Sequence, residues 1–409
     1  MTEFHDALEH RSATQRQQAI AAALPEHIAH ARTCTTCFAE KLAAIEPATI
    51  DSMQALAALP VLRKSELIER QQEQSPFGGL TATKDLARVF RSPGPIHEPQ
   101  GRGNDFWRFS RALHAAGFRA GGLIHNAFAY HFTPAGFMFD AAGRALGCPV
   151  FPAGSGQTEL QARALAHFQP RHYTGTPSFL KIILDKADEL GLQSDSLTSG
   201  LVTAEPLTPS LQAEFESRGL DVYQCYGTAD LGLIAYETEA REGLVVDEGV
   251  LVEIVRPGTG TPVPDGEVGE VVVTVFNRDY PLVRFATGDL SAVLPGMCPT
   301  GRTNMRIRGW MGRADQTTKV RGMFVHPSQI DEVCSRHPAI QRARLVVTAA
   351  DNRDAMTLYC EVEEQGDSLA EAIGDSLREV CSLRGEARLV AASSLPNDGK
   401  VIDDQRTFD

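Results

Sequence analysis

The segment Asp221–Ile234, with the sequence DVYQCYGTADLGLI, carries residue types that could bind a nucleotide. An apolar run ends in Tyr226-Gly227-Thr228-Ala229-Asp230, so that a glycine, a hydroxyl and a carboxylate follow a predicted strand. Open α/β sheets bind ligands at such strand ends. The carboxylate of Asp230 offers the oxygen ligands that Mg²⁺ prefers, and Mg²⁺ would in turn hold a polyphosphate. Taken alone, the segment is better explained as an ordinary polar turn.

A second carboxylate, Asp289, follows the β-rich run of Tyr280–Leu290 (YPLVRFATGDL) in a Thr-Gly-Asp turn. The two oxygens of a carboxylate can accept the hydroxyl groups of a ribose, as the acidic residue of dinucleotide sites does. The same residue type also commonly caps its own turn. Asp289 is therefore a candidate ribose ligand with an ordinary structural alternative.

Two basic positions lie closer to the C-terminus. Arg313 precedes a stretch that contains Lys319 and Arg321, and Lys400 follows the turn Asn397-Asp398-Gly399. Lysine places a point charge on a flexible stem, which suits a group that meets a phosphate. Each of these positions, taken alone, is also explained as a solvated surface charge.

An α/β framework is predicted to position these residues. The first 80 residues are rich in helix formers, and we expect helices over 10–24 and 25–45. From residue 87 short apolar runs alternate with helical stretches, which predicts a mainly parallel, helix-covered sheet. The predicted strands are 121–125, 149–152 and 172–173, and the predicted helices are 136–146, 157–167 and 177–190.

The pattern of residue types along the chain changes after about residue 235. Runs rich in β-formers at 249–255, 267–275 and 282–285 are separated by Pro/Gly turns, which predicts an antiparallel or barrel-like subdomain. Beyond residue 312 we expect a small α+β domain. Its predicted strands lie near Val320 and at 342–347 and 358–362, and its predicted helices are 327–336 and 368–382.

Composition narrows the class of protein. The chain has 409 residues, 43% of them hydrophobic and 22% charged, which indicates an ordinary globular protein of two or three domains. A net charge of −13 argues against binding to nucleic acid. The N-terminal residues do not resemble a signal peptide, no apolar run has membrane-spanning length, and the eight scattered cysteines are typical of reduced thiols. These features predict a cytoplasmic protein without membrane contact.

The four segments above, in this order and at these separations, resemble the adenylate-forming superfamily of acyl-CoA synthetases, peptide-synthetase adenylation domains and luciferases. The greatest similarity is to the phenylacetate-CoA ligase branch. Further stretches similar to that branch are Leu59-Pro60-Val61, Pro76–Gly79, Phe151–Glu159 and Tyr173–Ser178. The resemblance covers nearly the whole chain.

The resemblance implies both a fold and an activity. The fold is α/β, with a large N-terminal domain of helix-covered mixed sheets (1–314) and a small mobile C-terminal α+β domain (315–409) hinged at Asp315. Within the large domain, residues 1–80 are a helical lead-in and 236–311 a β-rich subdomain. The implied activity uses ATP and Mg²⁺ to convert a small aryl or arylacetic acid into an acyl-adenylate and passes it to coenzyme A. A homodimer is also implied.

The resemblance assigns roles to individual residues. Thr228 would contact the α-phosphate, Asp230 would hold Mg²⁺, and Lys400 would act in the adenylation step. The nucleotide-binding set would be Ala204, Glu205, Pro206, Tyr226, Gly227, Thr228, Asp289 and Arg313. The acyl pocket would lie near Phe128, Tyr130, Phe132 and Thr133.

The chain departs from the family pattern at two places. The family's phosphate loop is rich in Ser, Thr and Gly, whereas the matching stretch here is Arg91–His97, in which Pro93 and Pro95 remove N–H donors. Candidates to replace the lost donors are Arg91, Ser92, Gly94 and His97. Of a zinc site found in some relatives only Cys298 remains, so no zinc is expected.

Three hypotheses remain open at this point. The first is the CoA ligase, and the second is an adenylyltransferase that delivers the adenylate to another acceptor. The third is a degenerate relative that binds nucleotide or acyl-CoA without ligase activity, which the two prolines of the phosphate loop favour. Hydrolases with a GxSxG elbow and P-loop NTPases are excluded because neither motif is present.

Overall fold

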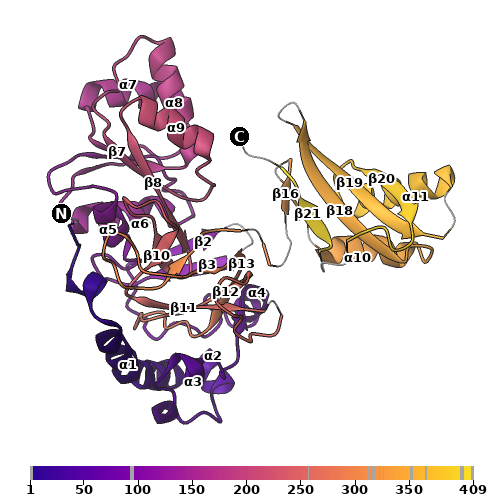
Figure 1. Cartoon of the computed structure of the whole chain (residues 1–409), viewed down its shortest axis with the longest axis horizontal. Coiled ribbons are helices and arrows are strands. Elements are labelled where there is room, and N and C mark those ends of the chain that lie inside the picture. Colours follow the sequence, from indigo (N-terminus) through magenta and orange to yellow (C-terminus); the bar gives the residue numbers. More distant parts are fainter. Residues whose placement is uncertain are drawn as a thin grey trace. The chain divides into compact units, whose positions relative to one another are not determined.

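Two compact units, Met1–Met311 and Gly312–Asp409, make up the computed structural model of the chain. It describes residues 3–92, 96–256, 258–311, 313–314, 318–321, 323–325, 327–350, 353–363, 366–396 and 400–406. Figure 1 shows the elements of each unit. The division falls just before the predicted domain boundary. The predicted hinge, Asp315, lies outside the described residues, so its role stays a prediction.

A nine-stranded sheet forms the centre of the N-terminal unit. In sheet order its strands are β14 (Val293–Leu294), β15 (Arg306–Ile307), β10 (Leu244–Val246), β9 (Gly232–Tyr236), β8 (Asp221–Thr228), β7 (Ser199–Val202), β6 (His172–Gly175), β4 (Ile124–Asn126) and β5 (Val150–Phe151). From β5 to β8 neighbouring strands are parallel, and from β8 to β14 they are antiparallel. The sheet is therefore mixed, and β8 belongs to both halves.

Helices alternate with the parallel strands, as the sequence predicted. They are α5 (Phe109–Ala115), α6 (Ala135–Ala145), α7 (Thr158–Phe168), α8 (Pro177–Glu189) and α9 (Pro209–Ser217). The starts of α8 and α9 follow from their sequence. The hydroxyls of Thr176 and Thr208 cap the first backbone N–H groups, and a proline at the first helical position needs no partner for its nitrogen.

A four-stranded sheet and a hairpin complete the strands of this unit. The sheet runs β1 (Leu62–Arg63), β13 (Phe285–Ser291), β12 (Gly269–Val275) and β11 (Val250–Val255), and the hairpin pairs β2 (Arg88–Ser92) with β3 (Ile96–Gln100). The strands of the predicted β-rich region thus divide between two sheets, and β1 joins them from the helical lead-in.

A buried ion pair ties this second sheet to the lead-in. Arg284, which is 2% exposed, donates from Nε and Nη2 to both carboxylate oxygens of Glu253 at 2.9 Å. Its other N–H groups reach the carbonyl oxygens of Ala57, Leu59 and Gly260. Every donor nitrogen and both acceptor oxygens of the pair are therefore satisfied.

The N-terminal lead-in is helical, but the boundary predicted between its first two helices, at Pro25, was wrong. One continuous helix, α1 (Ala13–Cys34), contains Pro25 in its interior, where the sequence predicted a boundary. Proline removes one helical hydrogen bond, and the buried side chains of Leu24, Ile28 and Ala31 on either side keep the helix packed on the core. The remaining helices are α2 (Thr36–Lys41), α3 (Met53–Leu56), α4 (Lys64–Glu73) and two 3₁₀ turns, Ala7–His10 and Pro47–Thr49. None of the helices in the described residues combines the length and apolar composition that a membrane crossing requires.

Residues near the N-terminus are bonded to much later parts of the chain. The carboxylate of Glu9, which is 1% exposed, pairs with Arg111 at 3.0 Å and with Arg302 at 3.0 Å. Arg11 pairs with Glu248 at 2.8 Å. These contacts fasten the first dozen residues onto α5 and onto the loops that follow β10 and β14.

The C-terminal unit is an α+β domain with its own core. Its sheet order is β20 (Glu386–Ala391), β19 (Arg353–Val362), β18 (Arg342–Ala350) and β21 (Ile402–Asp404), beside a hairpin of β16 (Thr318–Val320) and β17 (Met323–Val325). Helices α10 (Pro327–Arg336) and α11 (Asp367–Cys381) match the two predicted helices to within a residue. Buried apolar side chains of both helices and of β18 and β19 form the core.

Candidate active site

The predicted nucleotide-binding residues of the N-terminal unit lie where the parallel strands end. Tyr226, Gly227 and Thr228 form the last residues of β8 and are half-buried, and Ala204, Glu205 and Pro206 are exposed just after the neighbouring strand β7. Ala204 has a positive φ of 73°, which is uncommon for a residue with a side chain. The two strand ends thus present exposed backbone and hydroxyl groups at one edge of the sheet.

Asp289 meets Tyr226 across the two sheets. The Tyr226 hydroxyl donates to Asp289 Oδ2 at 2.8 Å, and Trp310 Nε1 donates to Oδ1 at 3.1 Å. Asp289 is 8% exposed, so these two donors fix the carboxylate in one orientation. Residues that lie far apart in the sequence therefore converge beside the end of β8.

Thr228 and Asp230 occupy the turn after β8. The Thr228 hydroxyl accepts the backbone N–H of Leu231 at 3.1 Å, so part of its bonding capacity maintains the turn. The side chain of Asp230 is fully buried, and its Oδ2 pairs with Lys64 Nζ at 3.2 Å. Within the described part of the chain, Asp230 Oδ1 has no hydrogen-bond partner.

A second buried acid, Glu98, lies near Asp230. Glu98 on β3 is 0% exposed, and neither of its carboxylate oxygens has a hydrogen-bond partner among the described residues. Burial, followed by the negative charge of Asp230, raises the pKa of Glu98 to about 8. The hydroxyl of Tyr280 is likewise buried without a partner in the residues that the structure describes, and burial with the charges of Asp230 and Glu98 raises its pKa. We call Lys64, Glu98, Asp230 and Tyr280 the acid cluster.

The predicted phosphate-loop residues lie on the β2–β3 hairpin, which also carries Glu98. Arg91 and Ser92 end β2, and His97 belongs to β3, where its backbone exchanges two hydrogen bonds of 2.8 Å with the side chain of Gln71. Gly94, the fourth candidate, lies outside the described residues together with Pro93 and Pro95. The backbone N–H of Arg91 donates to the carbonyl oxygen of Phe132 at 2.9 Å, which joins the hairpin to the predicted acyl-pocket segment.

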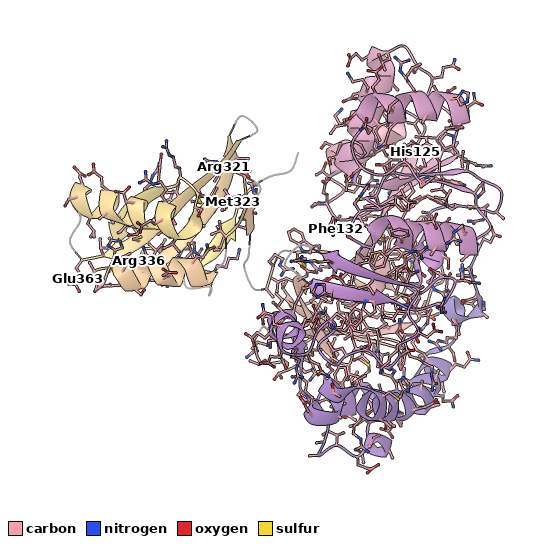
Figure 2. All side chains as sticks on the ribbon, turned by 180° about the vertical axis from the view of Figure 1, so that it is seen from behind. His125, Phe132, Arg321, Met323, Arg336 and Glu363 are labelled. Atoms are coloured by element: carbon pink, nitrogen blue, oxygen red, sulfur yellow. The ribbon has the colours of Figure 1, made fainter. Side chains whose placement is uncertain are left out.

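The predicted acyl-pocket residues differ sharply in exposure. Phe128 is 7% exposed and stacks on Phe139 in the core, with ring centroids 4.7 Å apart. Tyr130 is half-buried, and its hydroxyl accepts Asn126 Nδ2 at 2.7 Å. Phe132, by contrast, is 79% exposed, with its side chain at the surface of the N-terminal unit (Figure 2). Only Tyr130, Phe132 and the half-buried Thr133 can thus offer side-chain surface to a ligand.

Two predicted residues belong to the C-terminal unit. Arg313 lies just after the division between the units, and Lys400 is exposed, with Nζ 3.0 Å from Asp403 Oδ1. Their positions in the C-terminal unit fit a role that depends on movement between the units, and that role stays a prediction.

No group of three or more His, Cys, Asp or Glu side chains suited to a metal ion occurs in the described residues. A Mg²⁺ ion that accompanies a nucleotide needs only one or two carboxylates, because phosphate and water oxygens supply the rest. The partnerless Oδ1 of Asp230 fits that smaller requirement, although Lys64 holds the other oxygen.

Comparison with known proteins decides the family. Residues 127–275 match the family model of AMP-binding enzymes. The chain is 30% identical over 340 residues to the phenylacetate-coenzyme A ligase of Aromatoleum evansii, covering 79% of this chain and 76% of that enzyme. The chain belongs to the phenylacetate-coenzyme A ligase family. The corresponding ligase of Thermus thermophilus is also 30% identical, over 339 residues, with 79% of this chain and 75% of that enzyme covered.

A solved structure supports the fold of this ligase. A 2-hydroxyisobutyryl-CoA ligase in complex with 2-HIB-AMP and CoA superposes with a TM-score of 0.76 and 24% identity, over 98% of this chain and 91% of that one. The predicted α/β adenylate-forming fold is thus confirmed. Family membership likewise confirms the predicted enzyme class, an acid–thiol ligase that uses ATP to activate a carboxylic acid as an acyl-adenylate and transfers it to coenzyme A.

Four residues around the site of this ligase were given no role from the sequence: Lys64, Glu98, Tyr280 and Trp310. Tyr280 begins the segment that identified Asp289, whereas the other three come from separate stretches without a recognisable motif. A polar residue next to the apolar Leu282 and Val283 is the signal that could have indicated Tyr280 itself.

Proposed function

We propose that this ligase activates a small aryl or arylacetic acid and that Asp289 binds the ribose of ATP. The observation that carries the proposal is the fixed carboxylate of Asp289, bonded to Tyr226 and Trp310 beside the end of β8. A preoriented carboxylate recognises a pair of neighbouring hydroxyls without reorganising. The ring of Tyr226 would then stand beside the adenine, next to the exposed backbone of Ala204–Pro206.

An aromatic acid would meet aromatic side chains. Tyr130 and Phe132 lie on the segment between β4 and α6, and the backbone hydrogen bond from Arg91 to Phe132 joins that segment to the β2–β3 hairpin. Aromatic rings pair favourably with aromatic ligands beyond the area they bury. Thr133 supplies a hydroxyl at the same position. This combination favours an aryl or arylacetic acid over a long aliphatic one.

The reaction needs no protein nucleophile. A carboxylate is a poor acceptor for a thiol because its leaving group would be oxide. Attack of its oxygen on the α-phosphorus of ATP releases pyrophosphate and forms a mixed anhydride. The CoA thiolate then attacks the acyl carbon and displaces AMP. The protein contributes positioning and charge neutralisation, which are the main requirements of phosphoryl transfer. Thr228 would bond the α-phosphate in the first step.

Mg²⁺ would be held by Asp230, whose partnerless Oδ1 is a hard oxygen ligand. The ion would neutralise phosphate charge when bound. Lys64, already 3.2 Å from the other oxygen of Asp230, holds that carboxylate in place.

Lys400 would supply a positive charge for adenylation and would then have to leave before the thiol enters. Its place in the separate C-terminal unit makes such an exchange feasible, with Asp315 as the hinge and Arg313 near the ribose. Domain rearrangements of this kind commonly separate two steps at one site. The eight cysteines form no disulfide with one another, which fits a cytoplasmic enzyme, and a homodimer is the proposed assembly.

The test is an assay of purified protein with Mg-ATP, coenzyme A and a panel of aryl, arylacetic and aliphatic acids, read by mass spectrometry. We expect AMP and an aryl-CoA thioester, and a rate reduced about 10²–10³-fold in Lys400→Ala, as for loss of a transition-state charge contact. Lys186→Ala is the matched control, since Lys186 is a partly exposed lysine that is also paired with a carboxylate three residues away.

Other products of the assay would favour a different function. Free acyl-adenylate without thioester would assign a different acceptor. Nucleotide binding without turnover of any acid would favour the non-catalytic hypothesis and attribute the loss to the altered phosphate loop. Preference for aliphatic acids would contradict the aromatic pocket.

A further inference from the structure

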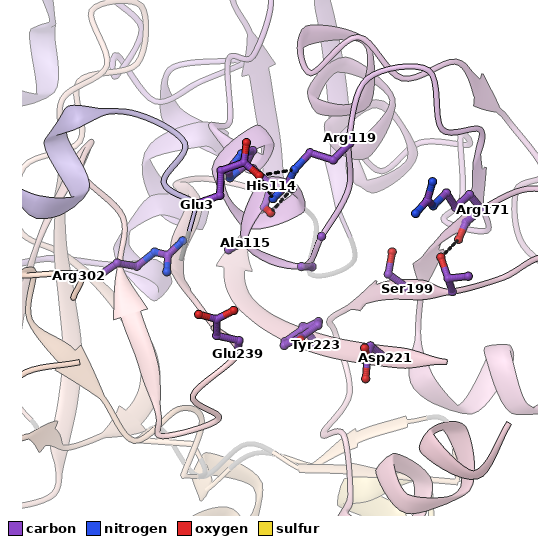
Figure 3. A pocket seen from close by; sticks show the side chains of 13 residues that line it. Glu3, His114, Ala115, Arg119, Arg171, Ser199, Asp221, Tyr223, Glu239 and Arg302 are labelled. Carbon is purple, nitrogen blue, oxygen red and sulfur yellow. Dashed lines mark hydrogen bonds and ion pairs between the residues drawn. The ribbon is translucent and has the colours of Figure 1, made fainter. Parts of the chain in front are cut away.

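A cavity lies at the opposite end of the parallel strands from the nucleotide site. Its volume is about 310 Å³, and it is lined by residues at the starts of three strands: Arg171 before β6, Ser199 at the start of β7, and Asp221 and Tyr223 on β8 (Figure 3). Ligand pockets of proteins begin at about 300 Å³. None of the residues that line this cavity takes part in the proposed reaction.

One side of the cavity is basic. Arg119 donates from Nε and Nη2 to a single oxygen of Glu3 at 3.1 and 2.9 Å, so a carboxylate already sits against this guanidinium. The guanidinium of Arg171 has no hydrogen-bond or ion-pair partner in the described residues. His114 lines the same side, is 8% exposed, and carries a buried Nδ1 without a partner in the part of the chain that the structure describes.

The electrostatic effect of these groups is visible at a buried histidine. His172, directly beneath Ser199 through a 2.7 Å hydrogen bond, has its pKa lowered to about 4, first by burial and then by the charges of Arg171 and Arg119. The positive charges of Arg119 and Arg171 therefore both reach His172. An anion bound between them would gain from both charges.

The other side of the cavity is acidic. Asp221, Tyr223 and Glu239 lie together across the cavity from His114 and Arg119 (Figure 3). Burial raises the pKa of Tyr223, and the charges of Asp221 and Glu239 raise it further while Arg241 opposes them. Asp221 is exposed, and its carboxylate has no partner among the described residues. The charged lining of the cavity thus consists of the guanidinium groups of Arg119, Arg171 and Arg302 and the carboxylates of Glu3, Asp221 and Glu239.

We propose that this cavity binds a small zwitterion, an amino carboxylic acid with its carboxylate at Arg171, beside Arg119, and its ammonium group at Asp221. A carboxylate alone would leave the acidic side repelling it, and an amine alone would meet two arginines. The ring of Tyr223 lines the cavity next to Asp221. Because β8 begins in this cavity and ends at Tyr226 and Thr228, the ligand would contact the strand that carries the nucleotide site.

The test is calorimetric titration of the full chain with glycine, β-alanine, 4-aminobutyrate and 6-aminohexanoate, a series that varies the separation of the two charges. Butyrate and butylamine serve as single-charge probes. We expect one length to bind best and both single-charge probes to bind at least about tenfold more weakly, since a charge-assisted hydrogen bond is lost. Arg171→Gln and Asp221→Asn should each weaken the best ligand about tenfold.

The matched control is Arg144→Gln on α6, which removes another largely exposed arginine whose partner is Asp140, four residues away. It should bind the best ligand as the wild type does. Both substituted cavity residues are exposed, so unchanged unfolding temperatures will show that the fold is retained. Absence of binding by all four amino acids, equal binding of butyrate, or an equal loss in Arg144→Gln would each overturn the proposal. None of these outcomes depends on ligase activity.

Discussion

Two buried charge clusters in the N-terminal unit are built on opposite principles. In the Arg284–Glu253 pair every donor and acceptor is bonded, and the pair links the second sheet to the lead-in. In the acid cluster, Glu98, Asp230 and Tyr280 keep oxygens without partners in the described residues, with Lys64 as the neighbouring cation. Buried polar groups are normally satisfied, and exceptions concentrate at functional sites. The first cluster therefore maintains the fold, and the second marks the place where a ligand is expected.

The largest effect should follow from breaking the satisfied pair. Arg284→Met leaves the Glu253 carboxylate buried and unpaired, which should lower the free energy of unfolding by about 3–5 kcal/mol. Urea denaturation measures it. The double variant Arg284→Met with Glu253→Leu should recover most of the loss, because no charge is then left buried. A double variant as unstable as the single one would show that the pair itself is strongly stabilising.

The acid cluster should instead make the stability of the fold depend on pH. Glu98 holds its proton up to about pH 8 in the folded state and releases it near 4.5 when unfolded. Stability should therefore be unaffected by this group below pH 4.5, fall by up to about 1.4 kcal/mol per pH unit as pH rises from 4.5 to 8, and change no further above pH 8. Glu98→Gln should remove this dependence, as measured by thermal unfolding between pH 5 and pH 9. A Gln variant with the same slope as wild type would refute the assignment.

Nucleotide recognition should depend on Asp289 without a comparable loss of stability. Asp289→Asn keeps the size of the side chain but loses the charge that receives hydrogen bonds from Tyr226 and Trp310. We expect AMP affinity to fall by about tenfold to a hundredfold, equivalent to one charge-assisted hydrogen bond. Fluorescence or calorimetric titration measures it. Asp265→Asn, in a turn of the same unit, is the control and should bind AMP normally.

The smallest effect should come from an ion pair outside both clusters. Lys41 lies 2.8 Å from Glu66 near the surface, where solvent and salt weaken the attraction. Lys41→Met should change the free energy of unfolding by less than about 1 kcal/mol. If Lys41→Met lowered the free energy of unfolding as much as Arg284→Met does, burial would not be what makes the Arg284–Glu253 pair more important than a surface ion pair.

The sequence predicted more of the fold than of the site. Alternation of apolar runs and helix formers placed α6, α7, α8 and α10 within a residue or so, because local patterning determines these elements. The interior Pro25 of α1 was misjudged because tertiary packing outweighs local preference. Tyr226 and Asp289 were identified through motifs, whereas Lys64 and Glu98 meet Asp230 only after folding. Spacing along the chain carries no record of such long-range contacts, nor of which carboxylate becomes buried.

The ion pairs of Glu9 have a consequence for biosynthesis. Glu9 emerges from the ribosome early, but its partner Arg302 is synthesised almost three hundred residues later. At about 5–20 residues per second the interval is roughly 15–60 s. Arg111, the other partner of Glu9, is made 102 residues after it, so for the rest of the interval the N-terminal segment has one of its two arginine partners while the parallel strands and their helices are completed. A nascent chain arrested before Arg302 should therefore have an N-terminus more sensitive to protease than one extended past it.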